Sequence, residues 1–154
     1  MQLQFKRLPH GEGLPLPAYA TPGSAAMDIC AAENVNLESG GTYMVSTGWA
    51  CAIPSGYELQ CRPRSGMASK GITIVNSPGT IDSDYRGEVK VLLQNTNPSK
   101  NLFGIDVPSI FQITRGDSIA QLVLAPVIQA QVVEVDELDM TQRGAGGFGS
   151  TGKN

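Results

Sequence analysis

Turn-forming residues interrupt this chain roughly every ten residues, for example at Ser39–Gly41, Pro54–Gly56 and Arg115–Asp117. Between the turns lie short runs of alternating apolar and polar residues, and no long segment has the period of an amphipathic helix. This pattern predicts an all-β sandwich or barrel. Strands are expected at Leu3–Leu8, Met27–Ala31, Thr42–Val45, Trp49–Ile53, Glu58–Arg62, Ile72–Asn76, Val89–Gln94, Phe111–Ile113, Ile119–Leu124 and Ala130–Val135.

Other structure is expected to be sparse. One short helix is predicted at Ser65–Lys70, with Gly71 as its stop signal. The segment Asn95–Ile110 contains Pro98 and Pro108 and is expected to be rich in loops. The chain shows no internal repeat, and 154 residues are enough for one domain with a substantial core.

Composition narrows the class of protein and its partners. Apolar residues make up 41% of the chain and charged residues 16%, as expected for a globular protein. A net charge of −3 gives no indication of a nucleic-acid or anionic-membrane partner. The sequence contains neither an apolar run of membrane-spanning length nor a signal-peptide core. We therefore expect a soluble, intracellular protein located in the cytoplasm.

The cysteines and the single histidine restrict the available chemistry. Cys30, Cys51 and Cys61 are odd in number and show no C-x-x-C spacing, so we expect reduced, buried thiols. His10 alone cannot support a structural zinc site, and a nucleophilic triad would depend on it entirely. General acid–base chemistry is therefore expected to come from carboxylates.

The segment Gly79–Val89 has the composition of a binding site. It holds Asp82, Asp84 and Tyr85 between glycines, and strands are predicted on both sides. A tight hairpin tip of this kind can fix an acid and a flat apolar ring at a defined separation. The alternative is an ordinary polar turn, because Asp, Ser and Gly are common turn formers.

The glycine-rich C-terminus resembles phosphate-binding loops. Residues Gly144–Gly149 match G-x-G-x-x-G, and Gly147–Lys153 match most of a P-loop, but both motifs require a strand before them and a helix after them. The local chemistry nevertheless offers backbone N–H groups, the hydroxyls of Ser150 and Thr151, and a stacking face on Phe148. We expect a flexible tail that orders over a bound nucleotide; the alternative is a frayed terminus.

Three further positions carry weaker signals. Arg64 and Ser65 stand at the probable helix start, where free N–H groups favour anions, although Ser65 could equally be a helix cap. Asp28 lies inside an otherwise apolar strand and needs a partner for its carboxylate. Gln121 alternates with apolar residues and points to water or into a pocket.

In this order and spacing, the segments resemble the five motifs of the homotrimeric deoxyuridine triphosphatases, or dUTPases. The segments are those around Asp28, Arg64–Gly66, Gly79–Gly87, Gly116–Gln121 and Arg143–Gly152. The resemblance implies a single-domain, jelly-roll-like distorted β-barrel, with residues 1–142 as the core and 143–154 as a mobile tail. It implies that Mg²⁺ assists the hydrolysis of dUTP to dUMP and pyrophosphate. This reaction limits uracil incorporation into DNA and supplies dUMP for dTTP synthesis.

The resemblance also assigns roles around the nucleoside. Asp82 corresponds to the general base that activates the water attacking the α-phosphorus. Tyr85 corresponds to the platform under the deoxyribose, where a 2′-hydroxyl would not fit. The segment that would read uracil and contact the nucleoside comprises Asn76, Gly79, Thr80, Ile81 and Lys90.

The remaining implied roles concern the triphosphate. Arg64, Ser65 and Gly66 correspond to phosphate binders, while Gln121 and Asp28 would position metal-bound water, with Mg²⁺ held mainly by the substrate phosphates. The tail would arrive from another subunit, so that the homotrimer shares its active sites. The tail residues that would clamp the γ-phosphate and cover uracil are Arg143, Phe148, Gly149, Ser150 and Thr151.

The chain departs from the family pattern at a few positions. Ala26 stands where the first motif usually has Gly, Ser118 stands where the fourth often has Arg, and the loop Thr96–Ile110 is longer than usual. Two alternative functions remain open at this level. One is a dCTP deaminase of the same fold, and the other is a nucleotide-sensing regulator that binds dUTP with little turnover.

Overall fold

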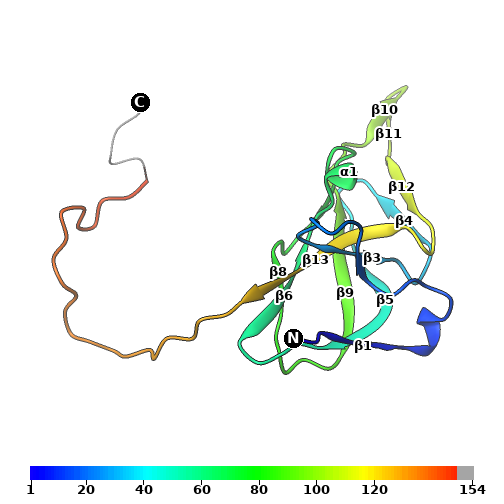
Figure 1. The fold of residues 1–154 in the computed structure, drawn as a ribbon. Coiled ribbons are helices and arrows are strands. Elements are labelled where there is room, and N and C mark those ends of the chain that lie inside the picture. Colours follow the sequence, from blue (N-terminus) through cyan, green and yellow to red (C-terminus); the bar gives the residue numbers. More distant parts are fainter. Residues whose placement is uncertain (149–154) are drawn as a thin grey trace.

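The computed structural model describes residues 1–148, which form a β body followed by an extended C-terminal arm (Figure 1). The elements before the middle of the chain are β1 (Gln4–Arg7), η1 (Pro9–Gly11), β2 (Ala18–Tyr19), β3 (Met27–Cys30), β4 (Val35–Glu38), β5 (Thr42–Ala52), β6 (Tyr57–Arg62) and α1 (Ser65–Ala68). The later elements are β7 (Ile72–Ile74), β8 (Gly79–Ile81), β9 (Glu88–Asn95), β10 (Lys100–Leu102), β11 (Ile105–Val107), β12 (Ile110–Ile113) and β13 (Ser118–Pro126).

Two antiparallel sheets make up most of the body. One has the strand order β1-β5-β9-β7, and the other has the order β2-β3-β13-β6-β8. The pairs β12–β4 and β10–β11 form two small additional sheets. The predicted all-β, jelly-roll-like fold with one short helix is confirmed.

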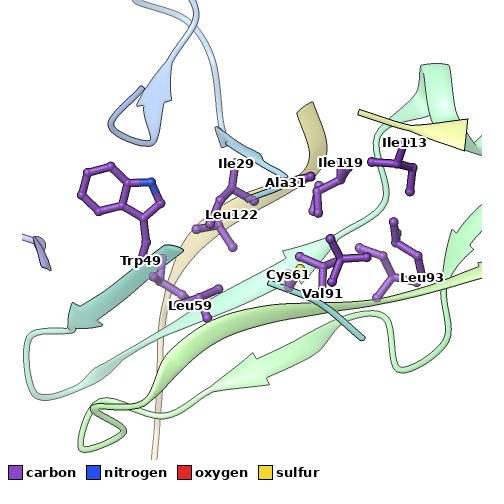
Figure 2. Close-up of a cluster of buried hydrophobic side chains, with 14 of the residues drawn as sticks. Ile29, Ala31, Trp49, Leu59, Cys61, Val91, Leu93, Ile113, Ile119 and Leu122 are labelled. Carbon is purple, nitrogen blue, oxygen red and sulfur yellow. The ribbon is translucent and has the colours of Figure 1, made fainter. Parts of the chain in front are cut away.

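The core lies between the two large sheets. Along β9 the buried Val89, Val91 and Leu93 alternate with more exposed residues, as the period of a strand requires. Figure 2 shows Val91 and Leu93 in the same buried cluster as Leu59 of β6 and Leu122 of β13. This packing holds the two sheets in a fixed relation, which the site described below depends on.

Strand β5 corrects the prediction of two separate strands at Thr42–Val45 and Trp49–Ile53. It runs unbroken from Thr42 to Ala52, and its pairing with β9 shifts register between Ser46 and Ala50. Gly48 has φ +73°, a backbone conformation that glycine adopts without strain. The strand therefore continues through a bulge where the sequence indicates a break.

The segment predicted as a tight hairpin tip is also more elaborate. Strands β7 and β9 pair with each other, as predicted, through Ile74 and Leu93. Between them, however, β8 crosses to the other sheet and pairs with β6, with Gly79 opposite Cys61. Residues 76–88 therefore bridge the two sheets at one place.

Several local predictions change as well. The loop-rich segment Asn95–Ile110 contains the β10–β11 hairpin, and the short strands β2 and β4 were missed. The predicted strand Ala130–Val135 is not formed; residues 127–148 instead run away from the body as an exposed arm (Figure 1). Within the described part of the chain, no helix is long and apolar enough to cross a membrane.

Candidate active site

A cleft of about 260 Å³ opens where residues 76–88 bridge the two sheets. It collects many of the residues that the sequence assigned to the nucleoside. They are Asn76, Thr80, Ile81, Asp82, Tyr85 and Lys90. The predicted residues thus share one surface, although they come from β8, β9 and the segments that precede each of them.

Asp82 and Tyr85 are fixed to each other by a single turn. Asp82 follows the last residue of β8, and the backbone N–H of Tyr85 donates to the carbonyl of Asp82 at 3.2 Å. The Tyr85 side chain remains 45% exposed, so its ring is available to a ligand. The turn therefore holds a carboxylate and an accessible aromatic ring at one edge of the cleft.

Gly79 and Asn76 form a close contact beneath the cleft. A Cβ atom on Gly79 would lie 3.0 Å from Nδ2 of Asn76, so glycine allows this approach. Strand β8 is also the last strand of its sheet, which leaves one edge of its backbone without a strand partner in the described chain. An edge of this kind presents N–H and C=O groups to a ligand.

A second cluster surrounds Asp28. Its Oδ2 lies 3.0 Å from Nη2 of Arg64, which supplies the partner that a carboxylate in this apolar strand was predicted to need. Gln121 is opposite Asp28 in the β13–β3 pairing, and its Nε2 donates to the carbonyl of Pro63 at 2.7 Å. Arg64 also donates to the backbone carbonyl of Ser118 at 2.9 Å, a contact independent of the Ser118 side chain.

The two clusters lie at the same level of the five-stranded sheet. Gln121 pairs with Asp28 on one side and with Arg62 on the other. Cys61, the residue before Arg62 in β6, pairs with Gly79 of β8. Strand pairing therefore brings the cluster around Asp28 and Arg64 close to the nucleoside cleft.

Ser65 and Gly66 belong to α1, directly after Arg64. Arg64 occupies the N-cap position of α1, and its side chain forms no capping hydrogen bond. The alternative interpretation of Ser65 as the cap is therefore wrong. Both residues are exposed. Their backbone and the Ser65 hydroxyl remain open to solvent beside the Arg64 guanidinium.

The residues that could serve a magnesium ion are few. No group of three or more His, Cys, Asp or Glu side chains within residues 1–148 could hold a metal. Asp28 and Gln121 line a shared cleft of about 280 Å³, and their oxygens are the hard ligands that Mg²⁺ prefers. Because the Arg64 guanidinium already pairs with Asp28, contact with the ion through water fits better than direct coordination.

The structure does not bring the tail to this cleft. Arg143 is exposed on the arm, where its Nε donates to the carbonyl of Gly146, and Phe148 is fully exposed. In Figure 1 the arm runs away from the body. Gly149, Ser150 and Thr151 lie outside the described residues, so their predicted roles have no structural counterpart here.

Glu88 is a residue of the cleft to which the sequence reasoning gave no role. Its Oε1 accepts hydrogen bonds from the backbone N–H groups of Thr47 at 3.1 Å and Gly48 at 2.8 Å. His10 Nε2 donates to the same oxygen at 2.6 Å. The only sequence signal that could have indicated a role for Glu88 is its position shortly after Tyr85 and Gly87. The bulge that it binds is distant in sequence.

These contacts change the acidity of Glu88. Burial by itself raises the pKa of the carboxyl group, but the hydrogen bonds from His10 and Gly48 lower it. The positive charges of His10 and Lys90 lower it further, and the net result is a pKa below the ordinary value of 4.5. The Glu88 carboxylate is therefore held in its charged form.

One turn thus presents an accessible tyrosine ring and a carboxylate at the cleft, and Arg64 lies in the neighbouring cluster. A family model described as dUTPase matches residues 12–152. The chain therefore belongs to the dUTPase family.

Individual relatives agree with this assignment. The chain is 56% identical to the deoxyuridine 5′-triphosphate nucleotidohydrolase of Zymomonas mobilis, covering 99% of this chain and 98% of the relative. The solved dUTPase of Staphylococcus bacteriophage 80alpha with dUpNHpp is 29% identical, with a TM-score of 0.84 and 99% of each chain covered. A mutant dUTPase of phage phi11 of S. aureus, described as coordinating a structural Mg(II) ion, is 29% identical, with a TM-score of 0.78, 91% of this chain and 100% of that chain covered.

The lowered pKa of Glu88 predicts a pH-dependent contribution to stability. A carboxylate whose pKa is depressed on folding stabilises the protein above its unfolded pKa, and this contribution is lost as the pH falls through the folded pKa. We expect the difference in melting temperature between wild type and Glu88→Gln to shrink below pH 4.5. Thermal unfolding at a series of pH values measures it, with Glu134→Gln on the exposed arm as the charge control. A difference that stays constant through the acid range would contradict the prediction.

Proposed function

We propose that the cleft at residues 76–88 is the place where this dUTPase-family chain hydrolyses dUTP to dUMP and pyrophosphate. The observation that carries the proposal is the turn that holds Asp82 and Tyr85 together at the edge of the cleft. The family relation supports the reaction, and the geometry supports the residues. The dCTP deaminase alternative has no support from the relatives found.

Asp82 acts as the general base in this proposal. Its carboxylate is exposed and needs only hydrogen-bond reach to a water molecule placed in line with the α-phosphorus. The water oxygen forms a bond to phosphorus, the bond to the bridging oxygen of the β-phosphate breaks, and Asp82 takes the proton. Pyrophosphate leaves with the electron pair of the broken bond.

Substrate choice is assigned to the cleft walls. The free edge of β8 supplies backbone groups that match uracil, with Asn76 and Lys90 beside them. A cytosine ring would leave some of those groups unpaired, which is costly in a desolvated site. The ring of Tyr85 packs against the deoxyribose and leaves no room for a 2′-hydroxyl.

The triphosphate is assigned to the second cluster. Arg64 contributes a guanidinium, and Ser65 and Gly66 contribute an exposed hydroxyl and backbone N–H groups. Mg²⁺ bound to the substrate phosphates would supply further charge neutralisation, with Asp28 and Gln121 ordering its water ligands. The phage phi11 relative supports a role for magnesium in this fold.

We further propose a homotrimer with shared sites, in which the tail of one subunit covers the cleft of another. The arm supports this, because it exposes apolar Ile128, Val132, Leu138 and Met140 and carries Arg143 and Phe148 away from the body. The segment Ala130–Val135, which the sequence predicts as a strand, has no partner strand within the described residues. Residues 143–154 would act as the lid, and the cytoplasmic location stays a prediction.

The substrate assignment predicts a selective reaction. In the presence of Mg²⁺ we expect pyrophosphate release from dUTP and little from UTP, dCTP or dTTP, because the cleft fits only one base and one sugar. Release assays on the four nucleotides side by side measure this. Tight binding of dUTP without turnover would instead favour the nucleotide-sensing regulator.

The role of Asp82 predicts a specific loss. Asp82→Asn should lower kcat by at least about a hundredfold while dUTP binding is retained, because only the base is removed. The matched control is Asp84→Asn, which changes a carboxylate on the same turn that does not line the nucleoside cleft. Steady-state kinetics measure kcat, and calorimetry measures the binding of dUTP. An Asp82→Asn enzyme with near-normal kcat would remove Asp82 from this role.

Shared sites predict complementation between two inactive chains. A chain ending at Gln142 should fold but lose nearly all activity, because the lid is gone. Reassembled with an equal amount of Asp82→Asn chains, it should regain about a quarter of wild-type activity, the share of sites that combine an intact base with an intact tail. No recovery in verified mixed trimers would rule out lids supplied by another subunit.

A further inference from the structure

The bulge of β5 depends on two glutamate side chains. Thr47 and Gly48 lie where the β5–β9 register shifts and have no partner residue in the ladder, while Ser46, the last paired residue before the shift, is opposite Lys90. Glu33 accepts from the N–H of Ser46 at 2.8 Å, and Glu88 accepts from those of Thr47 and Gly48. Because Thr47 is fully buried, loss of its acceptor leaves a polar group unpaired away from water.

The N-terminal turn is docked onto the same bulge. The N–H of Leu8 donates to the carbonyl of Gly48 at 2.9 Å. A Cβ atom on Gly11 would lie only 2.4 Å from that carbonyl oxygen, so the turn η1 and the bulge touch backbone to backbone. This contact brings Nε2 of His10 to 2.6 Å from Oε1 of Glu88.

The ring of Tyr85 is held by the backbone of Glu88. Its hydroxyl donates to the Glu88 carbonyl at 3.0 Å. A Cβ atom on Gly87 would lie 2.3 Å from that hydroxyl oxygen, so the ring folds back directly over Gly87. The position of the ring therefore follows the position of the first residue of β9.

We propose that Glu88 is a positioning residue for sugar discrimination, with His10 as its partner. The Glu88 carboxylate fixes the start of β9 to the β5 bulge and the N-terminal turn, and the Glu88 carbonyl fixes the ring of Tyr85. The inference rests on the proposed role of Tyr85 as the platform under the deoxyribose. It extends the determinants of that role to Glu88, which lines the same cleft, and to His10, which does not.

A carboxylate suits this position better than an amide. One oxygen of Glu88 accepts three hydrogen bonds, and the other lies 3.8 Å from Nζ of Lys90. A glutamine would turn an NH₂ group towards either the donors of the bulge or the Lys90 ammonium. His10 and Lys90 are the charged groups that face Glu88, and both are cationic or hydrogen-bond donors.

The test compares two glutamates that bind the same bulge. We expect Glu88→Ala to lower the ratio of kcat/KM for dUTP to that for UTP by about tenfold, because the tyrosine ring is no longer fixed. Glu33→Ala removes a comparable carboxylate bond to Ser46 but has no link to Tyr85. It should leave the ratio within about twofold, even if both variants melt at lower temperature.

His10→Ala and Tyr85→Phe extend the test. His10→Ala should lower the ratio less than Glu88→Ala, because the two backbone bonds of Glu88 remain. Tyr85→Phe keeps the ring and removes the hydroxyl, so combining it with Glu88→Ala should give less than the product of the two separate effects. If the two effects multiply independently, the link through the hydroxyl is refuted.

The outcomes separate this inference from the function on which it rests. If Tyr85→Ala lowers the dUTP-to-UTP ratio and Glu88→Ala does not, the platform stands and the positioning role of Glu88 is overturned. If Tyr85→Ala itself leaves the ratio unchanged, the platform assignment fails first. An equal loss of discrimination in Glu33→Ala would show general loosening of the bulge and would also overturn the proposal.

Discussion

The site depends on one segment that is divided between two sheets. Strand β8 pairs with β6 in the five-stranded sheet, and β9 pairs with β5 in the four-stranded sheet, so the chain between them is anchored at both ends. The apolar contacts between the sheets keep these anchors at a fixed separation (Figure 2). Asp82 and Tyr85 lie on that short connection, so a surface turn has the fixed geometry that the proposed catalytic role requires.

The polar groups around the cleft are held in place by contacts with neighbouring strands and loops. Asp28 is paired with Arg64, Gln121 is fixed by the Pro63 carbonyl, and Glu88 is tied to the β5 bulge. Each of these contacts restricts the motion of a side chain or a backbone segment that borders the substrate region. The Asp82 carboxylate and the Tyr85 ring are exposed on a turn whose surroundings are held in place by these contacts.

The sequence predicted most of the strands, and most of the residues that it proposes for the nucleoside line one cleft. The alternation of apolar and polar residues identified β9, because one face of a strand is buried. Short runs of this kind between regularly spaced turns identified the fold class. Three errors share a non-local cause. The break predicted between Val45 and Trp49 is a bulge whose N–H groups are bound by glutamates distant in sequence. Strand β8 pairs with a strand of the other sheet and not within the expected hairpin, and Ala130–Val135 has no strand beside it in the described chain.

From the sequence alone followed the all-β class and the family, through five motifs in the order typical of dUTPases, together with the prediction that carboxylates are the reactive groups. The sequence also required a partner for Asp28, since a carboxylate in an apolar strand is costly alone. That this partner is Arg64, and that Glu88 connects the cleft to the N-terminal turn, became visible only in the folded chain. Such pairings are set by which strands become neighbours, and strand neighbours far apart in sequence leave no local pattern by which they could be read.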